Sequence, residues 1–271
     1  MLHRCLLSEL PWKGILILLA LAGCQPPSEQ GLDDRASNST VVPKVVPNPA
    51  DCSGLVGLDL TFGRVDDAEE FSQGELVAGG RTADIEASVH FCRAKVSLHP
   101  VEGSEIHVEV WLPEQWNDKL YGLGGSGFDG GLAGSAGSLN SAIAQGYAAV
   151  ATDAGHTPAP SPQVWAFQQP EKVIDFGYRG NHLAAVAAKQ LIKTYYGKPE
   201  NQAYFLGCSN GGRDALMLVS RYPDAYNGVV AGAPAIRYVE IITQFLWNYH
   251  AVHGENPVPE KFPPPPNNGS Q

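Results

Sequence analysis

The sequence has 271 residues, a formal net charge of −10 and 44% hydrophobic residues, with 30 glycines and 21 prolines. This length and apolar content predict one large domain or two small ones with a sizeable core and many tight turns. The acidic balance argues against nucleic acid and anionic membrane surfaces as partners.

The N-terminal residues have the pattern of a targeting segment. Arg4 and Lys13 precede an apolar run at 15–22, which is too short to span a bilayer and is typical of a secretory signal. The run ends in Leu-Ala-Gly-Cys24, which resembles a bacterial lipobox and implies cleavage before Cys24 and lipidation of its thiol. The alternative is a plain signal peptide with a chance cysteine. We therefore predict a lipoprotein-type signal peptide over 1–23 and an exported bacterial protein, either an outer-membrane lipoprotein or a periplasmic or secreted one.

Residues 24–50 are rich in Pro, Ser, Asn and Asp, which predicts a flexible tether. Export makes disulfides available, and Cys52 and Cys92 are the natural pair in the region that follows. Cys208 is left without a partner.

The pattern of apolar residues predicts an α/β fold. Alternation predicts an antiparallel opening pair of strands at 85–91 and 106–111. Four short apolar runs predict further strands, and helical spacing predicts the segments between or after them. The strands are expected at 119–123, 147–152, 203–206 and 228–231, and the helices within 178–196, after residue 209 and at 236–250. Strands that alternate with helices predict a mostly parallel sheet.

A first glycine motif, Gly-Leu-Gly-Gly-Ser-Gly, occupies residues 122–127 and fits the outline of a dinucleotide-binding loop, with Asp153 available for a ribose hydroxyl. The segment 128–137 that should form the helix contains four glycines, at a cost of about 1 kcal/mol each. Asp153 also lies 26 residues past the motif, where about 20 is usual. The loop is better suited to another anion, such as a transition-state oxyanion.

A second motif, Gly-Cys-Ser-Asn-Gly at 207–211, lies between a predicted strand and a predicted amphipathic helix with no linker. That context predicts a nucleophile elbow with Ser209 in strained backbone. The N–H of Asn210 would face a developing oxyanion, and a second N–H would come from Gly125 or Ser126 in the first motif. The alternative is an ordinary strand-to-helix turn.

Four segments together resemble the tannase and feruloyl esterase family. They are "EVWLPEQWNDKLYGLGGSGFDGG", "GYAAVATDAGH", "DFGYRGNHLAAVAAKQLIKTYYG" and "GCSNGGRDALMLVSRYPDAYNGVVAGAPA". The resemblance implies an α/β-hydrolase with helices on both faces of its sheet, and a small aromatic ester as substrate. By position, Ser209 would be the nucleophile that forms an acyl-enzyme and Asn210 an oxyanion donor. The resemblance also implies that Cys208 bonds to a cysteine beside the catalytic histidine.

The chain departs from this family pattern after the "GAPA" segment. Asp214, Asp224, His250 and His253 follow Ser209 but do not give the order of serine, acid and histidine on successive strands. His156 and His182 precede the serine, and we expect structural roles for them.

These departures predict an incomplete α/β-hydrolase core at 51–235, and the start of a lid with a proline-rich tail at 236–271. We expect the chain to be weakly active or inactive. We also expect it to hold no cofactor or metal, because the calcium site of the family would lie in the lid beyond this chain. A membrane contact would be made only through a lipid anchor. Two alternatives remain, a non-catalytic membrane-tethered remnant or binding module, and a dinucleotide-binding oxidoreductase.

Overall fold

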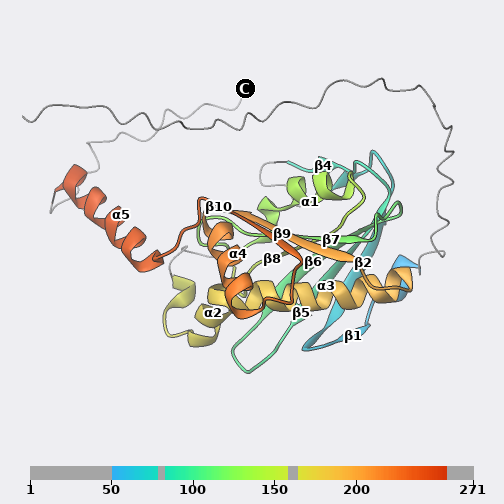
Figure 1. Cartoon of the computed structure of the whole chain (residues 1–271), viewed down its shortest axis with the longest axis horizontal. Helices are drawn as coiled ribbons and strands as arrows, with labels where there is room; N and C mark the ends of the chain where they lie inside the picture. The colour runs from blue at the N-terminus through green and yellow to red at the C-terminus, as the bar shows by residue number, and fades with distance from the viewer. Residues whose placement is uncertain (1–50, 79–82, 158–163, 255–271) are drawn as a thin grey trace, which may run out of the picture. The chain divides into compact units, whose positions relative to one another are not determined.

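A mixed eight-stranded sheet forms the centre of the computed structural model, with the strand order β1-β2-β5-β6-β8-β7-β9-β10 (Figure 1). The structure describes residues 51–78, 83–157 and 164–254. The strands of this sheet are β1 (Asp59–Leu60), β2 (Gly63–Phe71), β5 (Phe91–Leu98), β6 (Ile106–Pro113), β7 (Lys119–Leu123), β8 (Ala148–Thr152), β9 (Gln202–Cys208) and β10 (Gly228–Gly232). The predicted signal peptide with Cys24, the tether and the proline-rich tail lie outside the described residues.

The parallel part of the sheet consists of β8, β7, β9 and β10, which are the four strands predicted from the short apolar runs. Burial explains why the run of β8 was easy to recognise, since each of its residues is buried and small or branched. Because the strands are parallel, their carboxyl ends meet at one edge of the sheet. The predicted glycine motifs both begin at this edge.

The antiparallel part is larger than the sequence indicated. β5 pairs with both β2 and β6, and β6 pairs antiparallel with β8. The predicted strand at 85–91 is wrong: β4 (Ile85–Glu86) pairs only with β3 (Leu76–Val77) in a separate small sheet, and the long strand β5 begins at Phe91. The sequence did not reveal β5 because Arg93 interrupts its apolar pattern, although the Arg93 side chain is buried and pairs with Glu69.

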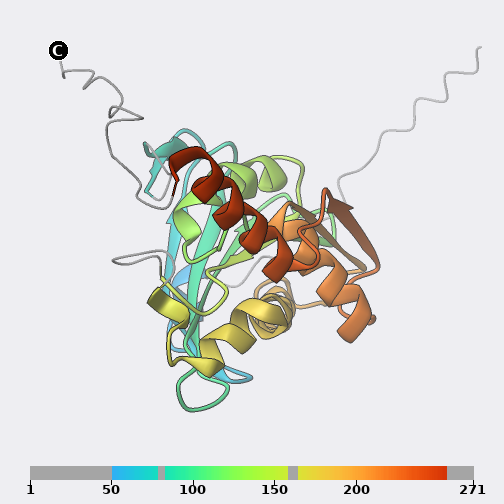
Figure 2. The ribbon, with the colours of Figure 1, turned by 90° about the vertical axis from the view of Figure 1, so that its left-hand side faces the viewer.

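Helices cover both faces of the sheet, as expected for the α/β class (Figures 1 and 2). α1 (Ala136–Ile143) packs on one face through Leu139 and Ile143. α3 (Gly180–Tyr196) and α4 (Asn210–Arg221) pack on the other face. Alanines on the buried side of α3 let this helix lie close to the sheet, and Gly197, with φ 71°, ends it.

A short helix precedes α3 and joins it through a wider turn. α2 (Pro170–Ile174) begins with proline at its first position, where no N–H is needed. A π-helical turn over Asp175–Arg179 then leads directly into α3. Such turns widen a helix locally and expose carbonyl groups to other partners, and two of these carbonyls are used at the site described below.

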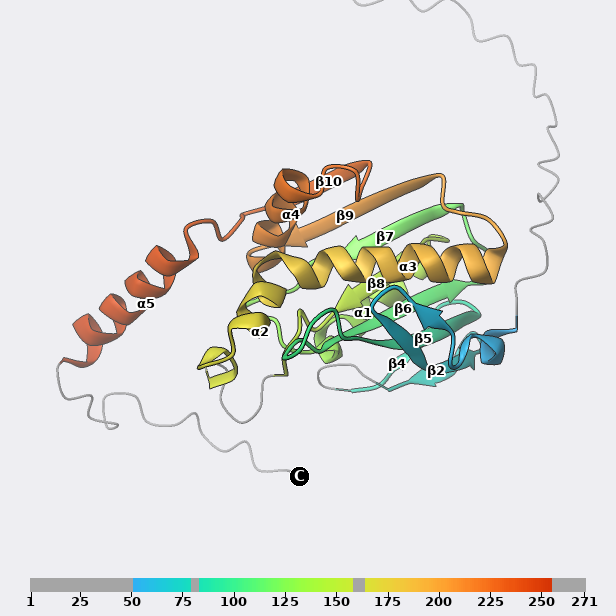
Figure 3. The ribbon, with the colours of Figure 1, turned by 90° about the horizontal axis from the view of Figure 1, so that it is seen from below.

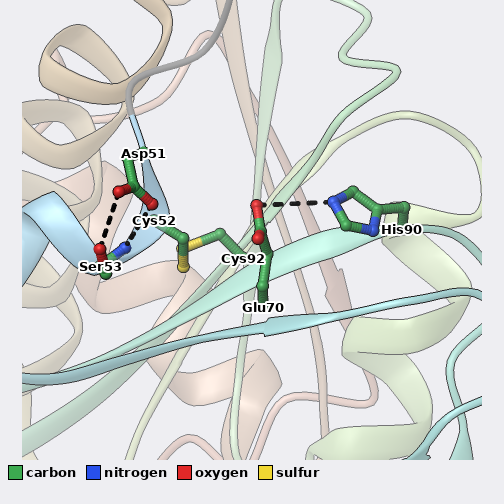
Figure 4. Close-up of a disulfide and its surroundings, with 6 residues drawn as sticks. All are labelled: Asp51, Cys52, Ser53, Glu70, His90 and Cys92. Atoms are coloured by element: carbon green, nitrogen blue, oxygen red, sulfur yellow. Dashed lines mark hydrogen bonds and ion pairs between the residues drawn. A yellow bond between two sulfur atoms is a disulfide. The ribbon is translucent and has the colours of Figure 1, made fainter.

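The predicted disulfide between Cys52 and Cys92 is present (Figure 4). Cys52 begins a 3-10 turn (Cys52–Leu55), which Asp51 caps by accepting hydrogen bonds from Ser53. Cys92 lies on β5, and both cysteines are buried. The bridge therefore fixes the start of the described chain to the antiparallel part of the sheet.

The last described helix, α5 (Tyr238–His253), follows β10 and runs away from the sheet (Figure 3). None of its residues is buried, and Val239 and Trp247 are 77% and 72% exposed. The helix predicted at 236–250 is therefore present, and its first residue, Tyr238, contacts the rings of Phe128 and Phe176, while the rest of its side chains are partly or fully exposed. No helix within the described residues has the length and apolar character needed to cross a membrane.

Candidate active site

The turn between β9 and α4 holds Ser209 in a strained backbone conformation. Its φ is 59° and its ψ is −119°, and a positive φ is uncommon for a residue with a side chain. The Ser209 N–H donates to the Gly232 carbonyl at 3.0 Å, and the Ser209 carbonyl accepts from the Ala235 N–H at 2.9 Å. These bonds fix the turn, so the exposed serine stands at the carboxyl edge of the parallel strands.

The two predicted motifs touch at four glycines, and we call their meeting point the glycine contact: Gly124, Gly125, Gly207 and Gly211. A Cβ on Gly207 would lie 2.1 Å from the Gly211 carbonyl oxygen, and one on Gly211 would lie 2.6 Å from the Gly125 carbonyl oxygen. A Cβ on Gly124 would lie 2.7 Å from the Gly211 Cα. Real Cβ atoms essentially never approach so closely. The missing side chains therefore allow the loop after β7 to lie directly against the first turn of α4.

A cavity of about 280 Å³ lies beside this contact. Its walls come from the glycine loop, the ends of β7 and β9, and the N-terminal end of α1, and it includes Ser126, Ser135, Ser138, Thr152 and Cys208. Hydroxyl groups and glycine backbone supply polar surface to this cavity, while Leu123 and Leu206 supply apolar surface. A small ligand here would lie next to the residue that precedes Ser209.

Asn210 is held in a single orientation by hydrogen bonds at both ends of its side chain. Its Nδ2 donates to Oδ2 of Asp129 at 2.7 Å, and its Oδ1 accepts from Nε of Arg213 at 2.6 Å. The residue is 1% exposed, so no water competes at these bonds. Since Asn210 is the first residue of α4, its backbone N–H lies at the positive end of the helix, beside Ser209.

Arg213 links α4 to the π-helical turn. Its two terminal nitrogens donate to the carbonyls of Gly177 and Phe176, both at 2.9 Å. The guanidinium also pairs with Asp214 at 2.7 Å and lies 4.3 Å from the ring centre of Phe176. The arginine is 8% exposed, and a buried arginine with all these partners is a structural anchor of the site.

Burial raises the pKa of both acids around this arginine. The pKa of Asp129 is well above its usual value, chiefly through desolvation and then through the charge of Asp214, while Arg213 acts in the opposite direction. Desolvation raises the pKa of Asp214 to about 6, and the Arg213 charge and the Gly125 N–H oppose the rise. Two enclosed carboxyl groups thus share one nearby cation.

Sequence reasoning missed Asp129 and Arg213. Asp129 comes from the loop after β7 and reaches a helix 81 positions further along the chain, so no spacing rule connects them. Arg213 follows Asn210 by three residues on α4, which is a detectable helical spacing, but charged residues at such positions are more often exposed. Its enclosure could not be read from the sequence.

His156 and His182 have the structural surroundings expected of them. His156 follows β8 and stacks on Trp165 with ring centres 3.8 Å apart, and His182 on α3 stacks on Tyr222 at 3.6 Å. Desolvation lowers the pKa of both imidazoles, so both favour the neutral form. Neither is a hydrogen-bond partner of Ser209 in the described structure.

A third histidine, which the sequence analysis did not single out, forms a pair with Asp153. Nδ1 of His107 lies 2.8 Å from Oδ2 of Asp153, and this hydrogen bond is the largest cause of the raised pKa of His107. β6, which carries His107, is separated from β9 by β8 and β7. Three strand spacings are roughly 14 Å, which places this pair too far from Ser209 to act as its base.

The remaining acids and histidines after Ser209 do not form a triad with it. Asp214 is occupied by Arg213, Asp224 lies between α4 and β10, and His250 and His253 lie on α5. Cys208 is exposed and has no disulfide partner among the described residues. Within the same residues, no cluster of three histidine, cysteine or acidic side chains is arranged to hold a metal ion.

The strand order, the turn at Ser209 and the helices on both faces define an α/β-hydrolase fold. The family model described as "Tannase and feruloyl esterase" matches residues 92–265, well over half of the chain. The chain therefore belongs to the tannase and feruloyl esterase family, whose members are carboxylic ester hydrolases.

Two curated relatives illustrate this similarity. An uncharacterized esterase of Xanthomonas campestris is 33% identical over 206 residues, which cover 76% of this chain and 35% of the relative. Feruloyl esterase B of Aspergillus niger is 36% identical over 183 residues, which cover 66% of this chain and 34% of the relative. The chain thus spans about a third of the length of the curated relatives it matches.

Solved structures give the same picture. Feruloyl esterase B from Aspergillus oryzae superposes with a TM-score of 0.67 and 29% identity, covering 75% of this chain and 40% of that chain. The tannin acyl hydrolase from Aspergillus niger gives a TM-score of 0.57 over 75% of this chain and 41% of its own, with 21% identity, so it supports the fold alone.

Proposed function

We propose that this chain carries the nucleophile half of an esterase site that cleaves esters of aromatic carboxylic acids. Ser209 attacks the ester carbonyl and forms an acyl-enzyme, which water then hydrolyses. The single observation that carries the proposal is the backbone of Ser209, whose φ of 59° is held by hydrogen bonds at a strand-to-helix turn. Such strain persists only where the surrounding structure maintains it, and it lifts the hydroxyl above the sheet.

Two backbone N–H groups are proposed to stabilise the oxyanion. The first is that of Asn210, at the start of α4, where the helix dipole adds positive charge. The second comes from the glycine loop, and we favour Ser126 over Gly125. The Gly125 N–H acts on the carboxyl group of Asp214, whereas Ser126 lines the cavity beside Cys208.

We propose that the general base and its orienting acid come from outside the described residues. None of the described histidines hydrogen-bonds the Ser209 hydroxyl, and the chain spans about a third of its relatives' length. Without such a base, the remaining acceleration comes from the oxyanion donors and from binding, with a loss on the order of 10⁴–10⁶-fold.

The test is hydrolysis of methyl ferulate, methyl gallate and a 4-nitrophenyl ester by the purified chain, with and without added imidazole as an external base. Ser209→Ala is compared with Ser220→Ala, which removes an exposed hydroxyl from the same helix. We expect the parent chain to hydrolyse the esters at a rate that imidazole raises. Ser209→Ala should abolish this rate, and Ser220→Ala should retain it. Equal rates in all three folded proteins would refute the nucleophile role and favour a binding module without turnover.

Export is proposed as well. The disulfide between Cys52 and Cys92 is the kind of bond that persists in oxidising compartments. Cys24 and the segment before it lie outside the described residues. The mass of the protein purified from a bacterial membrane fraction tests lipidation, and Cys24→Ala should release the protein from that fraction. A membrane-bound Cys24→Ala protein would contradict it.

A further inference from the structure

Four side chains form a continuous connection between the glycine loop and the first turn of α4. Asp129 accepts from Asn210, Asn210 accepts from Arg213, and Arg213 pairs with Asp214, with contacts of 2.7, 2.6 and 2.7 Å. We call these four residues the acid–amide network. It adjoins the glycine contact, since the Asp129 carboxyl group lies against Gly125, so it can control how the two backbones that meet there are aligned.

Asp129 is built into the loop in a way that turns its carboxyl group inward. It has φ 58°, in the left-handed region, and its N–H donates to the Ser126 carbonyl at 2.9 Å to close a turn. A Cβ on Gly125 would lie 1.7 Å from Oδ1 of Asp129. The missing side chain of Gly125 therefore makes room for this carboxyl group. Oδ1 is buried and makes no hydrogen bond within the described structure.

The Asn210 side chain depends on the position of the glycine loop because its two polar ends need different hydrogen-bond partners. Its amide nitrogen needs an acceptor, which Asp129 supplies, and its amide oxygen needs a donor, which Arg213 supplies. A rotation of the amide by half a turn would break both bonds in a buried place. The side chain thus fixes the distance between Asp129 and α4.

The charges explain why this arrangement tolerates burial. Asp129 and Asp214 face a single buried cation, Arg213, and burial favours the neutral acid at both positions. Asp153 adds a further negative charge near Asp129. One proton retained by the two carboxyl groups brings the net charge of the four-residue network close to zero. This is the state of lowest free energy for a buried cluster of charges.

We propose that Asp129 is a positioning residue that, through Asn210, holds the glycine loop 124–127 against the first turn of α4 and so aligns the two oxyanion N–H donors. This inference rests on the proposed function for its catalytic meaning. The structural part, the ordering of the loop by Asp129, stands on the contacts alone and can be measured without turnover.

The test variant is Asp129→Gly, because glycine accepts φ 58° without strain and only the side-chain contacts are lost. The matched control is Asp118→Gly, which removes another aspartate with a positive φ, 64°, just before β7, together with its 2.6 Å ion pair to Lys198. Asp129→Asn is the rescue variant, since asparagine tolerates this conformation and its side-chain oxygen can still accept from Asn210.

The first readout is amide hydrogen exchange of peptides that cover residues 121–131 and 209–216, at a temperature where all variants are folded. We expect exchange of the loop amides and of the first turn of α4 to rise about 10-fold or more in Asp129→Gly. Exchange should stay within about 2-fold of the parent in Asp118→Gly and Asp129→Asn. The second readout is ester hydrolysis, in which Asp129→Gly should lower kcat about 10- to 100-fold and change KM by less than 2-fold.

Exchange separates this inference from the proposed function. Unchanged exchange in Asp129→Gly, or equal increases in Asp129→Gly and Asp129→Asn, would overturn the positioning role whatever the hydrolysis rates are. Increased exchange that Asp129→Asn reverses supports the positioning role even where the parent shows no Ser209-dependent rate, and in that case the proposed function is what fails. A fall in kcat/KM that comes from KM alone would also overturn the positioning role of Asp129, because alignment of the oxyanion donors stabilises the transition state and should lower kcat.

Discussion

The glycine contact predicts that one added methyl group at Gly207 is strongly destabilising. In Gly207→Ala the new Cβ would lie 2.1 Å from the carbonyl oxygen and 2.3 Å from the carbonyl carbon of Gly211. Both are backbone atoms, so no side chain can rotate away. The strand β9 and the first turn of α4 would have to separate by about 1 Å, against the packing that holds them.

The size of the effect follows from that displacement. Overpacking a well-filled site costs about 1–3 kcal/mol, and we take the upper end, about 3 kcal/mol, because backbone must move. For a domain of this size, 1 kcal/mol corresponds to roughly 2–4 °C in Tm. The expected Tm of Gly207→Ala is therefore about 6–12 °C below that of the parent.

A second glycine gives the matched control. Gly137 lies in α1, and a Cβ added there would meet no atom within 4 Å. Alanine in an exposed helix is favoured over glycine by about 1 kcal/mol, so Gly137→Ala should raise the Tm by about 2–4 °C. Both variants are measured by thermal unfolding followed by circular dichroism in one buffer. A Tm of Gly207→Ala equal to or above that of the parent would refute the argument from close backbone contact.

Three further outcomes are expected. The pKa of Asp214 is raised to about 6, so between about pH 4 and pH 6 this carboxyl group is protonated in the folded state and ionised in the unfolded state. The free energy of unfolding therefore falls as pH rises through that window. Urea unfolding from pH 4 to 7 should therefore show Asp214→Asn gaining about 3 kcal/mol relative to the parent, and a pH-independent difference would contradict this. The double variant Cys52→Ala/Cys92→Ala opens a bridge with a sequence separation of 40 and should lose about 2–4 kcal/mol of unfolding free energy in urea, whereas an unchanged midpoint would count against the bridge. Tyr196→Phe leaves the buried Pro113 carbonyl without its 2.7 Å donor and should cost about 1–2 kcal/mol by the same measurement; no loss would mean that the carbonyl finds another donor.

β8, in the parallel part of the sheet, could be predicted from the sequence because it is buried on both faces, and β7, β9 and β10 stood out as short apolar runs although they are less buried. Runs such as that of β8, Ala148–Thr152, contain no charged residue and leave little choice of structure. β2, Gly63–Phe71, was missed because most of its residues face solvent and four of them are acidic. A strand near the edge of a sheet needs few apolar residues, and its pattern then resembles that of a loop.

The geometry of the candidate site was predictable where one local stretch determines it. Ser209 and Asn210 follow from a glycine-flanked turn between a strand and a helix, and the contact between the two glycine motifs could be inferred from the shared sheet edge. The partners of Asn210 could not be predicted, because Asp129 reaches it through a left-handed residue in an irregular loop. His107 and Asp153 were missed as a pair for a similar reason, since only the antiparallel pairing of β6 with β8 brings them together.

The glycine contact also determines how the protein can come apart. The ends of β7 and β9 and the start of α4 meet there through backbone, and the bond from the Gly124 N–H to the Leu206 carbonyl, at 2.9 Å, ties the loop to the central sheet. Separating the ends of β7 and β9 therefore requires breaking the sheet itself, so the amides of these strand ends, unlike those of the loop beyond Gly124, belong to the last cooperative unit to open. Slow exchange of these amides would accompany the global unfolding reaction, and the exposed helix α5 would exchange long before them.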